Sequence, residues 1–212
     1  FVKKIITVDG PAGSGKERIS KYIARKYKLY HLDSGTMYRR LAYELAKKNI
    51  QTFEVDKIKK IIKNIKRLSL RKTQALRKEK IGKDASEIAK LDFVRFFINS
   101  QQRLAINSPN KKNGFVIDGR DIGTVVFPDA EYKFFITASI ESRAQRRFDE
   151  LKDSDSSVTL DQIQEEIKDR DHFDSTRENS PLRKAEDAII VDTTHLDISG
   201  QVNMILEIIN NN

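Results

Sequence analysis

The chain of 212 residues contains no cysteine. That absence excludes disulfide scaffolds, zinc sites built on cysteine and catalysis by a thiol. No apolar run approaches the roughly 20 residues that a membrane-spanning helix needs. The first apolar stretch ends at Asp9 and is too short for the core of a signal peptide. We therefore expect a soluble, cytoplasmic protein without a membrane partner.

The composition is polar but sufficient for a buried core, because 38% of the residues are hydrophobic and 33% are charged. The length suits one domain that carries a small inserted subdomain. Forty Lys and Arg residues against 31 Asp and Glu residues leave a net charge of +9 with neutral histidines. This excess predicts anionic partners, whether nucleic acids, membrane surfaces or small phosphates.

Short β-branched or aromatic runs alternate with segments of helical periodicity. Buried strands are predicted at 5–8, 29–32, 114–118, 132–137 and 188–192. Helices are predicted at 15–27, 37–48, 92–107, 141–151, 159–171 and 199–209. This alternation predicts an α/β fold with a parallel five-stranded sheet flanked by helices, in which ligands bind at the carboxyl ends of the strands.

The segment from 51 to 90 differs from the rest of the chain, since it is rich in lysine and poor in aromatic residues. We interpret it as an inserted subdomain. The core would then comprise 1–50 and 91–212.

The turn after the first predicted strand matches the G-x-x-x-x-G-K pattern of a phosphate-binding P-loop. Its residues are Gly10, Pro11, Ala12, Gly13, Ser14, Gly15 and Lys16. In such a loop, backbone N–H groups turn towards phosphate oxygens, the following helix adds partial positive charge, and the lysine supplies a mobile cation. A glycine-rich turn that serves packing alone is the less favoured alternative.

Three further clusters combine arginines with small or acidic residues, at 32–39, 118–124 and 170–177. Together with the P-loop they closely resemble bacterial cytidylate kinases over nearly the whole chain. The most specific stretch is D-G-R-D-I-G-T-V-V-F-P-D-A at 118–130. The resemblance implies a P-loop fold, a nucleoside monophosphate (NMP)-binding insertion and a lid at about 148–178. It also implies transfer of a phosphoryl group from ATP to CMP or dCMP, giving CDP or dCDP and ADP.

The acceptor phosphate is the expected target of the arginine clusters, because a planar guanidinium grips dianionic oxygens through paired hydrogen bonds. By resemblance, its ligands are Ser34, Arg39, Arg120, Arg170 and Arg177, and the ribose is bound by Asp174. The expected catalytic residues are Lys16, Arg120, Arg170 and Arg177.

Base selection is assigned by the same resemblance to Ser86, Arg95 and Asp121. An aspartate accepts a hydrogen bond from the exocyclic amino group of cytosine, whereas uracil presents a second acceptor there. Asp118 and Asp121 have a purely structural alternative as caps of the following turn.

The ATP site is expected to comprise Gly10 to Lys16 together with Glu17, Arg18, Arg143 and Arg147. The roles of Arg143 and Arg147 stay divided between donor phosphate binding and a solvated helix face. His31, His172 and His195 lack metal-ligand spacing and are expected to be solvated or packed. We expect no metal site built from protein side chains, with Mg²⁺ held mainly by nucleotide phosphates and water.

Glu17 departs from the P-loop pattern, which places a serine or threonine directly after the lysine to meet magnesium. At an effective dielectric near 20, like charges about 6 Å apart cost roughly 2–3 kcal/mol before screening. We therefore expect weakened ATP binding that Glu17→Ser or Glu17→Gly improves, with CMP affinity nearly unchanged. The alternatives are that Glu17 points away or that Arg18 offsets it.

Two other functions remain open. One is a kinase for another pyrimidine nucleotide, UMP. The other is a weakly active P-loop protein that binds nucleic acid through its basic surface, although no aromatic residues are interleaved with the lysines of 57–83 as stacking would require. We expect a monomer whose partners are ATP, CMP and dCMP, without specific nucleic-acid binding.

Overall fold

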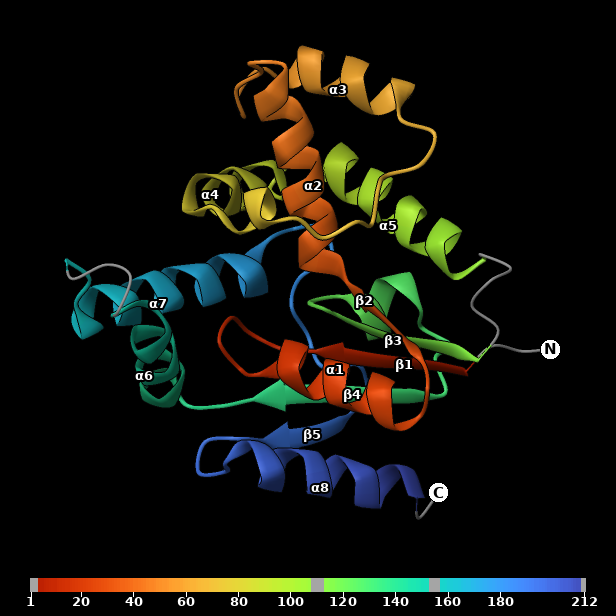
Figure 1. The fold of residues 1–212 in the computed structure, drawn as a ribbon, viewed down its shortest axis with the longest axis vertical. Coiled ribbons are helices and arrows are strands. Elements are labelled where there is room, and N and C mark those ends of the chain that lie inside the picture. Colours follow the sequence, from red (N-terminus) through yellow and green to blue (C-terminus); the bar gives the residue numbers. More distant parts are fainter. Residues whose placement is uncertain (1–3, 108–112, 153–156, 211–212) are drawn as a thin grey trace. The chain divides into compact units, whose positions relative to one another are not determined.

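The computed structural model describes residues 4–107, 113–152 and 157–210 (Figure 1). The strands are β1 (Lys4–Asp9), β2 (Tyr30–Asp33), β3 (Gly114–Gly119), β4 (Tyr132–Thr137) and β5 (Ile189–Asp192). The helices are α1 (Lys16–Lys26), α2 (Ser34–Lys47), α3 (Val55–Asn64), α4 (Glu79–Ile88), α5 (Asp92–Ile106), α6 (Ile140–Leu151), α7 (Leu160–Thr176) and α8 (Ile198–Asn210). Two shorter turns are the 3₁₀ helix η1 (Gln74–Arg77) and the π-helical turn η2 (Ile122–Val126). Across these ranges, no helix is both long and apolar enough to cross a membrane.

The strands form one sheet in the order β2-β3-β1-β4-β5. β1 pairs in parallel with β3 and β4, with Ile5 opposite Phe115 and Val8 opposite Phe134. β4 pairs in parallel with β5. Central parallel strands are covered on both faces, which explains why 5–8 reads as a continuous β-branched run rather than an alternating one. The predicted α/β class is confirmed.

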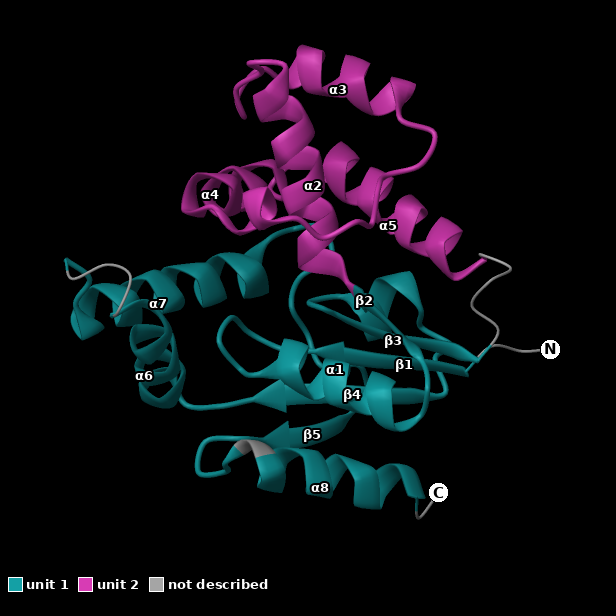
Figure 2. Cartoon of the chain, viewed as in Figure 1, with its two compact units in different colours: residues 1–32, 112–212 teal, residues 33–111 magenta. Residues whose placement is uncertain are grey.

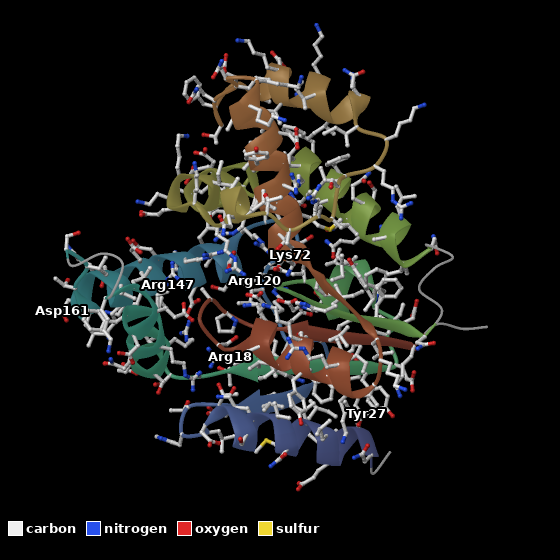
Figure 3. All side chains as sticks on the ribbon, in the orientation of Figure 1. Arg18, Tyr27, Lys72, Arg120, Arg147 and Asp161 are labelled. Carbon is white, nitrogen blue, oxygen red and sulfur yellow. The ribbon has the colours of Figure 1, made fainter. Side chains whose placement is uncertain are left out.

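The main hydrophobic core lies between the sheet and the helices α1 and α8. Ile19 and Ile23 of α1 and Ile205 of α8 pack with Val8 and Phe134 of the sheet, and all five are fully or almost fully buried. At the end of α1, the Tyr27 hydroxyl donates a hydrogen bond of 2.7 Å to Asn210 Oδ1 of α8 (Figure 3 labels Tyr27). These contacts fix α1, whose first turn follows the P-loop, against the sheet and α8.

The chain divides into two compact units (Figure 2). Unit 1 comprises residues 1–32 and 112–212, and unit 2 comprises 33–111. Unit 2 is therefore wider than the insertion predicted at 51–90. α2 and α5 belong to it because α2 packs on α4 and η1, while α5 packs on α2 and α3. Their periodicity shows an apolar face but does not identify the neighbour that covers it.

Candidate active site

The P-loop of unit 1 joins β1 to α1. Gly10 begins it with φ 156°, and a Cβ atom there would lie 2.1 Å from the carbonyl oxygen of Ile136 in β4. Only glycine allows the loop to begin this close to the neighbouring strand. Gly15 is the N-cap residue of α1 and provides no side-chain cap. The first N–H groups of α1 thus form the kind of helix start that binds phosphate.

Lys16 is buried at the first position of α1, and its Nζ donates a hydrogen bond of 3.0 Å to the carbonyl of Pro11. Burial lowers the pKa of Lys16 to about 7, and the positive charge of Arg120 acts in the same direction. The carboxylate of Asp118 opposes this shift. A phosphate beside Lys16 would supply the counter-charge that favours its ammonium form.

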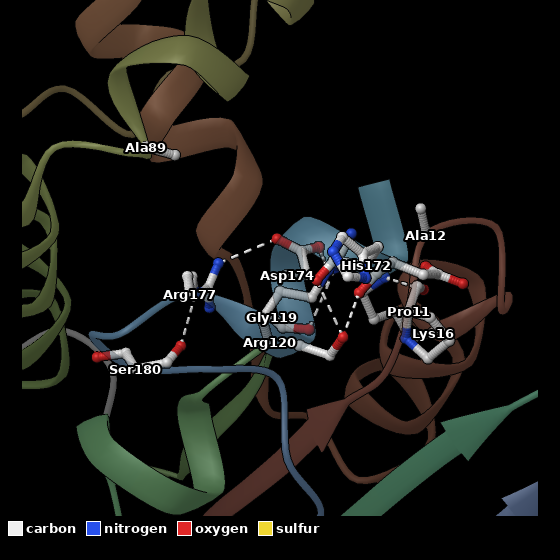
Figure 4. Close-up of polar contacts among 12 residues, drawn as sticks. Pro11, Ala12, Lys16, Ala89, Gly119, Arg120, His172, Asp174, Arg177 and Ser180 are labelled. Carbon is white, nitrogen blue, oxygen red and sulfur yellow. Dashed lines mark hydrogen bonds and ion pairs between the residues drawn. The ribbon is translucent and has the colours of Figure 1, made fainter. Parts of the chain in front are cut away.

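The acceptor cluster of unit 1 is organised by Asp174. Arg120 Nε donates to Asp174 Oδ2 at 2.8 Å, and Arg177 NH1 donates to Asp174 Oδ1 at 3.0 Å (Figure 4). Burial alone raises the pKa of Asp174, but the charges of Arg120, Arg170 and Arg177 and the hydrogen bond from Arg120 outweigh it and hold that pKa below its usual value. Two of the arginines predicted to bind the acceptor phosphate, Arg120 and Arg177, are therefore held by the one carboxylate of Asp174.

The helix α7 explains how this cluster forms. It begins with a capping box between Thr159 and Gln162 and continues to Thr176, beyond the end predicted at 171. Arg170 and Asp174 are four residues apart, so they lie along one face of the helix, and Arg177 follows Asp174 by three residues, just beyond the last helical residue. Thr176 is followed by Arg177 as the C-cap residue.

Arg143 of α6 is a buried bridge rather than part of a solvated face. Its Nε donates to the carbonyl of Ala138 at 2.9 Å, and its NH1 donates to the P-loop carbonyl of Ala12 at 3.1 Å. NH1 also lies 2.6 Å from Asp171 Oδ2 of α7. Arg143 thus connects the P-loop to the helix that carries Asp174. The sequence does not identify Asp171 as a site residue, because its contact with Arg143 arises only when α6 packs on α7.

Arg147 of α6, labelled in Figure 3, pairs instead with Glu150 at 3.1 Å, and both side chains are about half exposed. Binding of donor phosphate by Arg147 and Arg143 stays a prediction.

His31 of β2 and Asp118 of β3 form a second pair that sequence reasoning did not predict. His31 Nε2 lies 2.6 Å from Asp118 Oδ1, and both side chains are largely buried. The expectation of a packed or solvated histidine therefore overlooked a polar partner. The residues are 87 positions apart, and only the pairing of adjacent strands could reveal their contact.

Asp121 is buried next to Arg120 and is the N-cap residue of η2. Its side chain makes no cap hydrogen bond; its backbone carbonyl instead accepts from Val125 N at 2.9 Å. The carboxylate of Asp121 therefore does not cap the turn, contrary to the structural alternative.

The predicted acceptor residues of unit 2 each have local contacts within that unit. Ser34 is buried at the first position of α2, after the N-cap Asp33. Arg39 NH1 donates to the carbonyl of Leu76 at 3.0 Å, and Ser86 Oγ donates to the carbonyl of Gly82 at 3.2 Å. Arg95 is buried, and its guanidinium lies 6.0 Å from the ring centre of Tyr38. Their roles towards a nucleotide stay predictions.

The structure changes the expectation for Glu17. Its Oε1 lies 2.5 Å from Nζ of Lys21, one turn further along α1, and both side chains are substantially exposed. A carboxylate drawn towards Lys21 points along the helix, away from the phosphate-binding start of α1. This geometry favours the alternative that Glu17 points away over the weakened ATP binding expected from sequence. Arg18, labelled in Figure 3, is exposed beside it.

The residues that the structure describes offer a divalent metal no evident set of side-chain ligands. Within the described part of the chain, no three His, Asp or Glu side chains are grouped to hold an ion. The hydroxyl that P-loops commonly offer to the metal is replaced by Glu17. The described side chains around the P-loop therefore lack the donor set that a protein-held metal centre would need.

Comparisons with known proteins show the fold through a solved structure and the family through curated relatives and a family model. A crystal structure of an uncharacterized protein from Eubacterium ventriosum is similar in fold, with 15% identity, a TM-score of 0.58 and coverage of 99% of this chain and 100% of that one. A cytidylate kinase of Fusobacterium nucleatum is 39% identical over 95% of this chain and 94% of its own length. A cytidylate kinase of Caldicellulosiruptor saccharolyticus is 42% identical over 98% and 96% respectively. The cytidylate kinase family model matches residues 6–211. The chain therefore belongs to the cytidylate kinase family.

Proposed function

We propose that this protein transfers the γ-phosphoryl group of ATP to CMP or dCMP, giving ADP and CDP or dCDP. Family membership supports a nucleoside monophosphate kinase. The observation that carries the proposal is the Asp174 cluster, which holds Arg120 and Arg177 in the same unit as the P-loop and Lys16. Fixed cations near a phosphate-binding loop suit the transfer of a phosphoryl group between two nucleotides.

The reaction needs no protein nucleophile, because positioning and electrostatic stabilisation account for most of phosphoryl transfer. An oxygen of the CMP phosphate attacks the γ-phosphorus of ATP, and the bond from that phosphorus to the bridging oxygen of ADP breaks. The P-loop N–H groups and Lys16 hold the donor phosphates. Arg120, Arg170 and Arg177 hold the acceptor phosphate, and Asp174 keeps two of these arginines oriented while it binds the ribose. Mg²⁺, if held by the nucleotide phosphates and water as the sequence suggests, would supply neutralising charge, while this chain's own residues supply the positioning.

The substrate is tested by an assay of ADP release over a panel of CMP, dCMP, UMP, AMP and GMP. We expect CMP and dCMP to be used far better than the purine nucleotides, because Asp121, Arg95 and Ser86 suit the edge of a cytosine. A matched variant, Asp121→Asn, is expected to narrow the preference for CMP over UMP, since an amide can also donate to the uracil carbonyl. Equal kcat/KM for AMP and CMP in the wild type would contradict the proposal.

Binding of ATP is expected to depend on pH through Lys16. Because the pKa of Lys16 is lowered to about 7, the side chain is mostly neutral at pH 8 and must gain a proton to pair with phosphate. The dissociation constant for ATP should rise between pH 7 and 9, by up to about tenfold per unit. Calorimetry at pH 8 in buffers of different ionisation enthalpy should detect uptake of close to one proton. Lys16→Arg, whose guanidinium stays charged, should abolish that uptake; unchanged uptake would exclude Lys16 as its source.

Replacement of Glu17 should have little effect on ATP. An exposed pair four residues apart on a helix contributes only about 0.3–0.5 kcal/mol, but this suffices to favour the Lys21-bound conformation seen here. We expect Glu17→Ser to change KM for ATP by less than about threefold, and Lys21→Ala to raise it by at most about twofold. Initial rates at saturating CMP measure both. A tenfold fall in KM for ATP in the Glu17→Ser variant would instead support the repulsion between Glu17 and ATP that the sequence predicts.

A further inference from the structure

Asp9, the last residue of β1, makes two hydrogen bonds that the proposed reaction does not explain. Its Oδ1 accepts from the backbone N–H of Ile122 at 2.9 Å, and its Oδ2 accepts from the backbone N–H of Gly123 at 2.7 Å. The residue is only 4% exposed and directly precedes Gly10 of the P-loop. One buried carboxylate therefore joins the strand that begins the P-loop to the segment that follows Asp121.

The segment after Asp121 is held closely against β1. Its π-helical turn is closed by hydrogen bonds to the carbonyl of Asp121 from Val125 N at 2.9 Å and Val126 N at 3.2 Å. A Cβ atom on Gly123 would lie 2.8 Å from Thr7 Oγ1 and 3.3 Å from Asp9 Oδ2. The backbone of 121–126 thus depends on Asp9 at one end and on its own hydrogen bonds at the other.

We propose that Asp9 is a positioning residue for substrate selection, which places Arg120 and Asp121 for the acceptor nucleotide through the N–H groups of Ile122 and Gly123. The inference rests on the proposed function, because it assigns the reading of cytosine to Asp121. A carboxylate suits this task better than an amide of the same shape. It offers an acceptor to both N–H groups, whereas asparagine would turn an NH₂ group towards one of them.

The pKa of Asp9 depends on the charges of Arg120 and Asp121, the two residues that it is proposed to position. Burial raises the pKa of Asp9 to about 7, against the lowering effect of the N–H groups of Gly123 and Ile122. The charge of Asp121 raises this pKa further, and the charge of Arg120 lowers it. Lys133 of β4 also lies beside Gly123, but its ammonium is bound to Asp187 at 2.7 Å. Because the pKa of Asp9 is about 7, kinetics are measured at pH 8.5, where the ionised carboxylate can accept both N–H groups.

The test compares wild-type enzyme with Asp9→Asn. We expect KM for CMP to rise about tenfold and the preference for CMP over UMP in kcat/KM to fall at least fivefold. KM for ATP should change less than twofold, because the P-loop begins at Gly10, which is seated on β4 independently of Asp9. Asp187→Asn is the matched control. It removes the exposed carboxylate that pairs with Lys133. It should leave KM for CMP, KM for ATP and the preference for CMP over UMP unchanged.

A second variant covers the case in which Asp9→Asn does not fold. Gly123→Ala leaves Asp9 intact but displaces the same segment, and it should reproduce the rise in KM for CMP and the reduced preference over UMP. The inference is overturned if the folded variants raise KM for CMP and ATP alike and keep the wild-type preference for CMP, which would indicate a merely structural role. A wild-type enzyme with no preference for CMP would instead overturn the proposed function, and this inference with it.

Discussion

Arg120→Ala is expected to lower kcat/KM for CMP by about 10²–10³-fold, or roughly 3–4 kcal/mol of transition-state stabilisation. The expectation rests on how firmly the guanidinium is held. Its Nε is bound to Asp174 at 2.8 Å, its NH1 donates to the carbonyl of Gly119 at 3.3 Å, and 17% of the side chain is exposed. A cation placed in advance needs no reorganisation when charge develops on the transferred phosphoryl group. Steady-state kinetics with CMP and ATP measure the loss.

Three further variants make this measurement specific. Arg120→Lys keeps the charge but loses the planar fork, so we expect an intermediate loss of at least tenfold. Arg25→Ala removes an exposed arginine from the last turn of α1 and should leave kcat/KM within twofold of wild type. Arg177→Ala should resemble Arg120→Ala, because Arg177 is the other arginine bound to Asp174. If Arg120→Ala and Arg177→Ala each lowered kcat/KM by less than tenfold, neither arginine would take part in the reaction.

Asp174→Ala is expected to destabilise the protein by about 3–5 kcal/mol. The substitution leaves two arginines without their shared carboxylate, although only 17% of the Arg120 side chain and 8% of the Arg177 side chain are exposed. Urea denaturation at pH 7 measures the change. Asp161→Ala, at the exposed first turn of the same helix (Figure 3), should cost less than about 1 kcal/mol. An equal loss of stability in both variants would show that Asp174 has no special role.

The difference in stability between wild type and Asp174→Ala should depend on pH, with a defined sign. The pKa of Asp174 is held below its usual value in the folded protein, so its stabilising contribution is present above the unfolded pKa of about 4. That contribution is lost as the pH falls through the folded pKa. The stability difference between wild type and Asp174→Ala should therefore be constant from pH 5 to 7 and shrink below pH 4.

Much of the fold follows from short patterns in the sequence. The run 5–8 before a glycine-rich turn predicts a buried strand and a phosphate loop, because local sterics and strand burial require those residue types. The helix predicted at 159–171, by contrast, stops before Asp174, and only the structure extends it to Thr176. The family resemblance carried by 118–130 leads to the same enzyme class as the comparisons.

The partners of individual charges were decided only by the tertiary structure. Arg143 appears on a helix face of repeated arginines, yet packing directs it to Ala12 and Asp171. Asp9 reads as the end of a strand, yet it binds N–H groups 113 and 114 residues away. The sequence by itself determined the five strands, the helices between them, the P-loop and the enzyme family, because these depend on neighbouring residues and on ancestry. It did not reveal α3 and α4 within the lysine-rich segment 51–90, whose faces are set by packing inside unit 2. The carboxylates that hold the P-loop and the arginines in place depend on contacts between distant segments, which exist only once the chain has folded.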